Sequence, residues 1–331
     1  MNILAAATLL IFSLTAFAHH SRSHYSYETQ EIEGELMAVH WVNPHVGFTV
    51  SVVNEEGEAE LWRVEGVSNL LGMQRGNVSS DVFTIGEHVI ARGSPSVRRA
   101  RDLLTTNLLL ENGREILLSS EAEPYWSQQG FGAPGDSNYE LIDAIAENRG
   151  IFRVWTAAPG GIGQNTHFLF TETAIAAREN WDPVDNFAER CEPEGMPRIM
   201  RNPHAFEFED NGDEISLVSE LYDLVRTIHI NDNAAPLGMS ASPLGYSTGF
   251  WDESTLTVTT NNINWPYFDN IGTPQSESVT MLETFTVSND QTRLNYQLTV
   301  TDPTTFSEPA VYERYWLALG EHIEVYDCQV Y

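Results

Sequence analysis

The chain has 331 residues and a formal net charge of −30, and all 17 of its basic residues are arginine, because it contains no lysine. A surface this acidic repels nucleic acid and anionic lipid. The missing lysine excludes Schiff-base chemistry, a P-loop lysine and a lysine general base. Because one hydrophobic core rarely extends over so many residues, we expect two domains.

Residues 1–18 have the length and composition of a secretory signal peptide. They are largely apolar and end in Ala16-Phe17-Ala18, a small-x-small cleavage pattern. Cleavage there makes His19 the first residue of a periplasmic or secreted protein. An uncleaved anchor or a buried strand is the alternative, since residues 1–3 lack a basic side chain. No later stretch is apolar enough to span a membrane.

Residues 19–120 carry the pattern of a small β-domain. After a polar arm, alternating apolar residues predict three strands, a short helix and two more strands. This order is typical of an OB-like, five-stranded barrel. The expected strands are 31–40, 46–53, 58–67, 87–92 and 103–110, with the helix at 69–75.

Residues 121–150 are rich in glycine, serine, proline and acidic residues, which predicts a linker with a helix at 139–147. Residues 151–331 then form a second domain, with a helix at 172–180 followed by a meander of strands. Such a meander predicts an up-and-down, lipocalin-like barrel, with a two-sheet sandwich as the alternative. The expected strands are 206–209, 214–223, 225–230, 248–251, 256–260, 279–287, 294–301 and 322–328.

The two cysteines, Cys191 and Cys328, lie far apart in the chain and both follow the leader. In an oxidising compartment the simplest interpretation is one disulfide that ties the end of the chain to the start of the second domain. Two buried free thiols are the alternative. Neither cysteine has the C-x-x-C spacing of a redox or zinc site.

Short motifs stand out in both halves of the chain. In the first half they are Ala18-His19-His20-Ser21, Trp41-Val42-Asn43-Pro44-His45, Leu61-Trp62-Arg63-Val64-Glu65 and Gly86-Glu87-His88-Val89. In the second half they include Cys191-x-Pro193-x-Gly195-x-Pro197-Arg198 and Gly249-x-Trp251. This set resembles an uncharacterised family of exported bacterial proteins that begin with His-His-Ser and carry W-x-N-P-H on an OB-like domain, often with a second β-rich domain behind it. The resemblance implies an architecture and no activity. The chain departs from the pattern at Asn202-Pro203-His204, where a turn without histidine is expected.

The histidines near the expected mature N-terminus form the first candidate site. Copper(II) favours nitrogen ligands in a square plane, and an N-terminal His19 supplies two, its α-amine and a ring nitrogen. A third would come from His45, in the turn between the first two strands, or from His40. The alternative is a tight turn in which a backbone carbonyl satisfies His45, with a disordered N-terminus.

The second candidate site is a polar stripe in the second domain. Alternation predicts that Glu220, Tyr222 and Arg226 share one face of a strand, and it leaves Glu283 alone among apolar residues of another. A buried carboxylate needs a partner, for which Arg226 or Arg198 is a candidate. The four residues are either catalytic groups in a ligand cavity or an ion-paired network inside a filled barrel. The candidate ligand-binding residues are Arg198, Tyr222, Arg226, Tyr246, Trp251 and Glu283.

Two functions of different classes follow from these sites. The first is an exported binding protein with a site for copper or another metal at His19 and a loop histidine. The alternative is an enzyme or carrier that acts on a small apolar molecule in the second barrel. A module that binds another exported protein is a third interpretation, which no single motif supports. A nucleic-acid partner is not expected.

Overall fold

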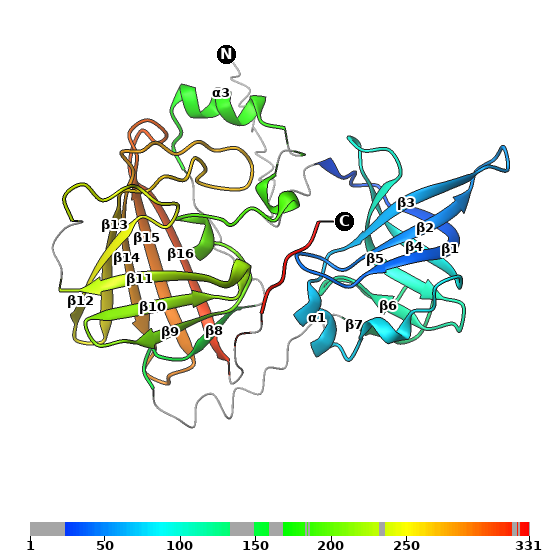
Figure 1. Cartoon of the computed structure of the whole chain (residues 1–331), viewed down its shortest axis with the longest axis horizontal. Helices are drawn as coiled ribbons and strands as arrows, with labels where there is room; N and C mark the ends of the chain where they lie inside the picture. The colour runs from blue at the N-terminus through cyan, green and yellow to red at the C-terminus, as the bar shows by residue number, and fades with distance from the viewer. Residues whose placement is uncertain are drawn as a thin grey trace, which may run out of the picture.

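The β-strands of the protein form two barrels, one in each half of the chain (Figure 1). The computed structural model describes residues 24–132, 149–158, 168–182, 184, 186–231, 236–319, 323 and 325–330. The expected signal peptide, His19 and the helix expected at 139–147 lie outside these residues. Among the helices that the structure describes, none is long and apolar enough to cross a membrane.

The N-terminal barrel has the five strands and the helix that the sequence predicts. A parallel pairing of the third and fifth strands closes the order β3-β2-β1-β4-β5. Leu36, Phe48 and Val64 point inward and are fully buried, as their alternation requires. The elements are β1 (Gln30–His40), β2 (Gly47–Val53), β3 (Ala59–Gly66), α1 (Leu70–Arg75), β4 (His88–Pro95) and β5 (Asp102–Leu110).

Two short strands, β6 (Glu115–Leu117) and β7 (Gly130–Gly132), extend this sheet into the segment expected to be a linker. A Cβ atom on Gly132 would lie 2.3 Å from the carbonyl oxygen of Leu117, and the φ of Gly132 is +122°. Only glycine fits there. Glycine therefore permits a close strand pairing at a place where composition alone suggested a flexible connection.

The C-terminal domain is a closed barrel with the strand order β10-β11-β12-β13-β14-β15-β16-β8-β9. Of the two expected architectures, the barrel is the one observed. Neighbouring strands are antiparallel except β11 and β12, which are parallel. The strands are β8 (Val154–Ala157), β9 (Phe206–Asp210), β10 (Glu214–Ser219), β11 (Leu224–Ile230), β12 (Tyr246–Asp252), β13 (Thr255–Asn261), β14 (Thr280–Val287), β15 (Arg293–Thr301) and β16 (Ala310–Leu319).

Short helices lie in the loops of both domains. Helix α3 (Glu172–Asn180) is the helix expected in the second domain, and the side chain of Thr171 caps it by accepting from the backbone of Ala174. Single 3₁₀ turns are Ser80–Val82, Phe187–Arg190, Arg198–Met200 and Leu221–Asp223.

The expected final strand at 322–328 is wrong. The last strand is β16, and the described residues of 322–328 form no strand, only an isolated bridge from Cys328 to Asn43. In β16, the inward-facing residues Ala310, Tyr312 and Trp316 are buried. Val311, which lies between Ala310 and Tyr312, is exposed. The alternation is present, but the charged pair Glu313 and Arg314 in its middle obscures it in the sequence.

Five aromatic side chains form a closed cluster inside the C-terminal barrel. Each ring centroid lies 4.8–5.6 Å from the next, and most pairs meet edge to face. The aromatic cluster consists of Phe206, Phe208, Phe285, Tyr296 and Trp316. Packed side chains therefore fill this part of the interior.

The expected disulfide between Cys191 and Cys328 is present, and 137 residues separate its two cysteines in sequence. It joins the C-terminal tail, residues 325–330, to the segment that precedes β9. The tail runs between the two barrels (Figure 1). The disulfide therefore holds the end of the chain at the boundary of the domains.

Replacing Cys191 and Cys328 together by serine is expected to lower the free energy of unfolding by about 2–5 kcal/mol, because a long closed loop restricts the unfolded chain. Urea denaturation followed by tryptophan fluorescence measures the change. A reductant should destabilise the wild type similarly and leave the double variant unaffected. Equal midpoints for the wild type and the double variant would contradict the expectation.

Candidate functional site

His45 lies in the loop Trp41–His45 between β1 and β2, and its ring is held by a buried carboxylate. The Nδ1 atom of His45 is 2.6 Å from Oε1 of Glu65 on β3. An ionised carboxylate can only accept a hydrogen bond, so we assign the proton to Nδ1. In the neutral ring, Nε2 then carries the lone pair, which is the electron pair that a metal ion uses.

Glu65 belongs to a polar network that continues across β3 and β5. Its Oε2 atom lies 2.8 Å from Nη2 of Arg63, and Nη1 of Arg63 lies 3.3 Å from Oδ2 of Asp102. Asp102 also accepts a hydrogen bond of 2.9 Å from the hydroxyl of Tyr25. The first described residues of the chain therefore connect through two carboxylates and one arginine to His45.

Burial by itself raises the pKa of the Glu65 carboxyl, but the hydrogen bond from His45 and the charges of His45, Arg63 and Arg99 lower it to about 2. The carboxylate is thus ionised at any pH well above 2. Burial and the charge of Arg63 lower the pKa of His40, which favours the neutral form of that ring, the form that a metal ion requires. The Nε2 atom of His40 lies 3.0 Å from the hydroxyl of Thr49.

The N-terminal arm enters the fold beside this network. The Nδ1 atom of His24 lies 3.0 Å from the hydroxyl of Ser96, and Tyr25 pairs with Ser96 as an isolated bridge. His19, the third predicted metal ligand, lies outside the described residues. Within the described part of the chain, no three His, Cys, Asp or Glu side chains are grouped so that they could hold a metal ion.

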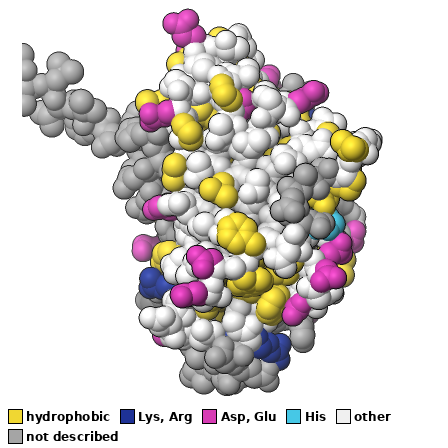
Figure 2. All heavy atoms as spheres, turned by 90° about the vertical axis from the view of Figure 1, so that its left-hand side faces the viewer, with side chains coloured by type: hydrophobic (Ala, Val, Ile, Leu, Met, Phe, Trp, Pro, Cys, Tyr) yellow, Lys and Arg dark blue, Asp and Glu magenta, His cyan; other side chains and the backbone are white. Residues whose placement is uncertain are grey.

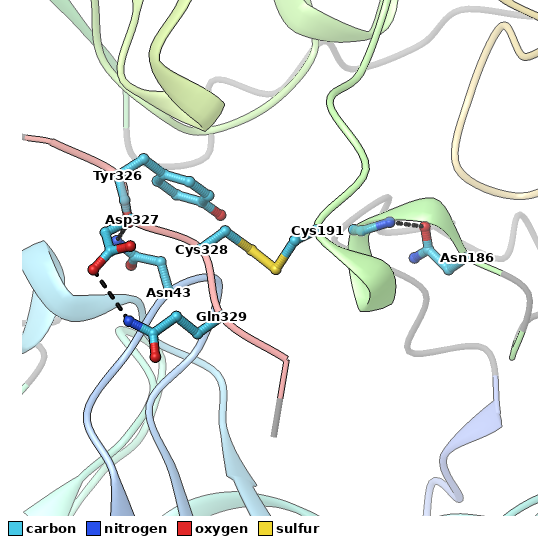
Figure 3. The surroundings of a disulfide bond; sticks show 8 residues. Asn43, Asn186, Cys191, Tyr326, Asp327, Cys328 and Gln329 are labelled. Atoms are coloured by element: carbon cyan, nitrogen blue, oxygen red, sulfur yellow. Dashed lines mark hydrogen bonds between the residues drawn. A yellow bond between two sulfur atoms is a disulfide. The ribbon is translucent and has the colours of Figure 1, made fainter.

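Asn43 connects the same loop to the C-terminal tail (Figure 3). Its side-chain amide donates to the carbonyl of Tyr326, and its own carbonyl accepts from the backbone of Gln329 at 3.0 Å. Its Oδ1 atom accepts from the backbone of Leu70 at the start of α1. The tail thus binds a residue two positions from His45, and the disulfide anchors that tail to the second domain.

The polar stripe predicted in the second domain is divided between two places. Tyr222 and Asp223 adopt left-handed backbone conformations, with φ of 60° and 50°, and form a tight turn that ends β10 before Glu220. Glu220 and Tyr222 therefore do not share the inward face with Arg226. The expectation of one continuous strand over 214–223 failed, because the turn interrupts an alternation that the residue types alone continue.

Glu220 and Tyr222 instead contact residues at the boundary of the two domains. Oε1 of Glu220 lies 3.0 Å from Nδ1 of His204, whose ring packs against Tyr326 of the tail. The ring of Tyr222 also packs against that of Tyr326, and the two ring centroids lie 5.1 Å apart. Arg198 lies 3.3 Å from Glu194, whose pKa burial raises. The sequence did not mark His204 and Glu194 as site residues, although Arg198 lies only four positions after Glu194.

Arg226 and Glu283 form the buried ion pair that the sequence suggested. The guanidinium binds both carboxylate oxygens, with 3.0 Å from Nη1 to Oε1. Nε of Arg226 donates to Ser247, and the hydroxyl of Tyr296 donates to Glu283 at 2.8 Å. Every charge in this network has partners, as a buried structural pair requires.

Tyr246 and Trp251, the other two predicted ligand-binding residues, do not join this network. Tyr246 is buried and stacks on His229, with ring centroids 4.5 Å apart. Trp251 is 39 % exposed, and its ring lies 6.3 Å from that of Phe152. The structure therefore brings only Arg226 and Glu283 of the predicted set into direct contact inside the barrel.

The fold and the His45 network define a class, a protein of two tandem β-barrels with a histidine–carboxylate pair at the junction. Residues 7–103 match the model of a family described as a family of unknown function (DUF6152). The match includes the Trp41–His45 loop and Glu65 and ends at the start of β5. A search of curated proteins found no match to the chain.

The low pKa of Glu65 makes the stability of the protein depend on acid pH. The group contributes stability that is fully present above its ordinary pKa of about 4.5 and is lost as the pH falls through about 2. The loss amounts to roughly 3 kcal/mol. Urea denaturation at a series of pH values should show this loss in the wild type and not in Glu65→Gln. Glu33→Gln, an exposed site on β1, should behave as the wild type.

Replacing Glu283 by alanine leaves Arg226 buried without its charge partner and should lower the free energy of unfolding by about 3–5 kcal/mol. Glu313→Ala, on the outer face of β16, is the matched control and should change it by less than about 0.5 kcal/mol. A double replacement, Arg226→Met with Glu283→Leu, should recover most of the loss. Equal midpoints for Glu283→Ala and Glu313→Ala in urea denaturation would contradict the structural role.

Proposed function

We propose that the protein is an exported metal-binding protein that binds copper(II) with the mature N-terminal residue His19 and the loop residue His45. One observation carries the proposal: the Nδ1 atom of His45 is held at 2.6 Å by the buried carboxylate of Glu65. Histidines that bind metals characteristically donate their other ring N–H to such a carboxylate, which fixes the tautomer and the ring orientation.

The chain supplies the remaining nitrogen ligands from His19. An N-terminal histidine offers its α-amine and a ring nitrogen, and copper(II) favours such nitrogen sets. Five positions separate His19 from His24. A segment of this length reaches at most about 17 Å, which limits how far the amine of His19 can lie from His24. His40, with its lowered pKa, is the second candidate for the loop ligand.

Charge supports a cation as the ligand. The protein has a formal net charge of −30, which raises the local concentration of cations around it. In the network itself, the guanidinium groups of Arg63 and Arg99 balance the two carboxylates of Glu65 and Asp102, so the attraction for a cation comes from the protein as a whole. The alternative function, an enzyme or carrier for a small apolar molecule, has less support because Arg226 and Glu283, which it would use, are paired with each other and with neighbouring hydroxyl groups.

Copper(II) titration of the processed protein, followed by calorimetry and electron paramagnetic resonance, tests the proposal. The protein that begins at His19 should bind one equivalent, and a form extended by one N-terminal alanine should lose the nitrogen-rich signal, because its first amine is no longer on a histidine. Equal affinity of the two forms would exclude the N-terminal amine.

Variants of the loop locate the other ligands. His45→Ala should remove a ligand, and Glu65→Gln should weaken binding about 10–100-fold through loss of the carboxylate that orients His45. His88→Ala, an exposed histidine on β4, is the control and should bind as the wild type. If His40→Ala abolishes binding while His45→Ala leaves it unchanged, the loop ligand is His40.

A further inference from the structure

Two arginines of the C-terminal domain, Arg201 and Arg314, form no ion pair with any described residue. Arg314 projects inward from β16 and is 6 % exposed, and Arg201 is half-buried in the loop that follows the 3₁₀ turn Arg198–Met200. Burial lowers the pKa of both guanidinium groups. Burying a cation that forms no ion pair is costly, which makes the surroundings of these two groups informative.

Arg314 uses only one side of its guanidinium. Nη1 donates to the backbone carbonyls of Met200 and Asn202, both at 3.1 Å. Nε and Nη2 are buried and have no hydrogen-bond partner. These two nitrogens share one edge of the planar group, and their N–H bonds are parallel, which is the geometry that binds both oxygens of a carboxylate.

Tyr312 and Arg201 lie next to this edge. The Tyr312 side chain is 2 % exposed. Its hydroxyl interacts with both guanidinium groups, and this interaction raises their pKa against the effect of burial. Arg201 stacks over the Tyr312 ring at 4.9 Å, and its Nε is also without a partner. Three guanidinium nitrogens, Nε and Nη2 of Arg314 and Nε of Arg201, thus lack a well-oriented acceptor in one region of the barrel.

The carboxylates of this region already have other partners. Glu283 binds Arg226 and Tyr296. Asp269, the acid whose charge reaches Arg201, accepts from the backbones of Ile271 and Thr273 and from the hydroxyl of Thr273. Arg226 shows how this barrel satisfies a guanidinium that has only a structural role. The contrast indicates that the acceptor for Arg314 comes from outside the chain.

We propose that the free edge of Arg314, the hydroxyl of Tyr312 and the guanidinium of Arg201 bind the carboxylate of a small organic acid. Two parallel N–H groups on one guanidinium match the two oxygens of a carboxylate. The aromatic rings of Trp316, 4.6 Å from the Arg314 guanidinium, and of Phe268, 4.5 Å from that of Arg201, suit an apolar body on the same molecule. Arg201, being half-buried, marks the side from which the acid enters.

The outer surface does not compete for such a ligand. Acidic side chains outnumber basic ones on the face of the barrel shown in Figure 2. An organic anion is therefore repelled by the exterior and is bound where the arginines lie inside. This inference does not depend on the proposed copper site, which uses residues of the other barrel.

Calorimetric titration of the full mature protein with sodium octanoate tests the proposal. The wild type should bind octanoate at one site, and the bound acid should raise the melting temperature as its concentration increases. Tyr312→Phe removes one donor to a charged group and should weaken binding about tenfold or more. Arg314→Lys keeps the charge but loses the paired N–H edge, and it should weaken binding further.

Arg293→Lys is the matched control. Arg293 also stacks on an aromatic ring, that of Tyr315, but it occupies an exposed strand position. The affinity of this variant for octanoate should equal that of the wild type. Tyr312→Phe removes only a hydroxyl and keeps the buried ring, so it should fold even if Arg314→Lys does not. The proposal is overturned if the wild type does not bind octanoate, or if Tyr312→Phe binds it as tightly. Equal affinity for inorganic phosphate would overturn the assignment to a carboxylate.

Discussion

The C-terminal tail is the constraint on which the arrangement of the protein depends. Cys328 fastens it covalently to Cys191 of the second domain, while Asn43 of the first domain bonds to the backbone on both sides of that cysteine. Because Asn43 is two residues from His45, the loop with the proposed copper ligand and the position of the second domain are physically coupled. Displacement of the tail would remove two hydrogen bonds from the loop, so docking of the domains and metal binding are expected to favour each other.

Arginine has two different roles inside the second barrel. Arg226 meets a carboxylate and hydroxyl groups that satisfy its donors, and it stabilises the fold only as long as that set is complete. Arg314 is satisfied on one side by backbone carbonyls and presents its other edge without an acceptor. In a chain without lysine, every permanently charged basic side chain is a guanidinium, so the same planar group serves both packing and the proposed recognition of an acid.

Much of the fold was predictable because the alternation of apolar residues is strong in the first barrel and in β12 to β15. The failures have local causes. At Tyr222 and Asp223 the chain turns, although the residue types continue the alternation of a strand. In β16 the charged residues Glu313 and Arg314 interrupt the apolar pattern, so the strand is not recognisable from the sequence. For the candidate sites, the pairing of Glu283 with an arginine followed from the cost of burying a lone carboxylate. The partners of His45, His204 and Arg314 could not be predicted, because each comes from a strand or loop distant in the sequence.

By itself, the sequence determined the acidic, lysine-free composition, two β-domains, the cysteine pair and the presence of histidines near an expected N-terminus, since all of these depend on residue identity or short periodicity. Only the tertiary structure decided that the second domain closes as a barrel, that Glu65 holds His45, and that the tail binds Asn43. It also decided which buried guanidinium finds a carboxylate. The reason is physical: hydrogen bonds and ion pairs between distant segments depend on strand register and on the path of the loops, which local patterns do not specify.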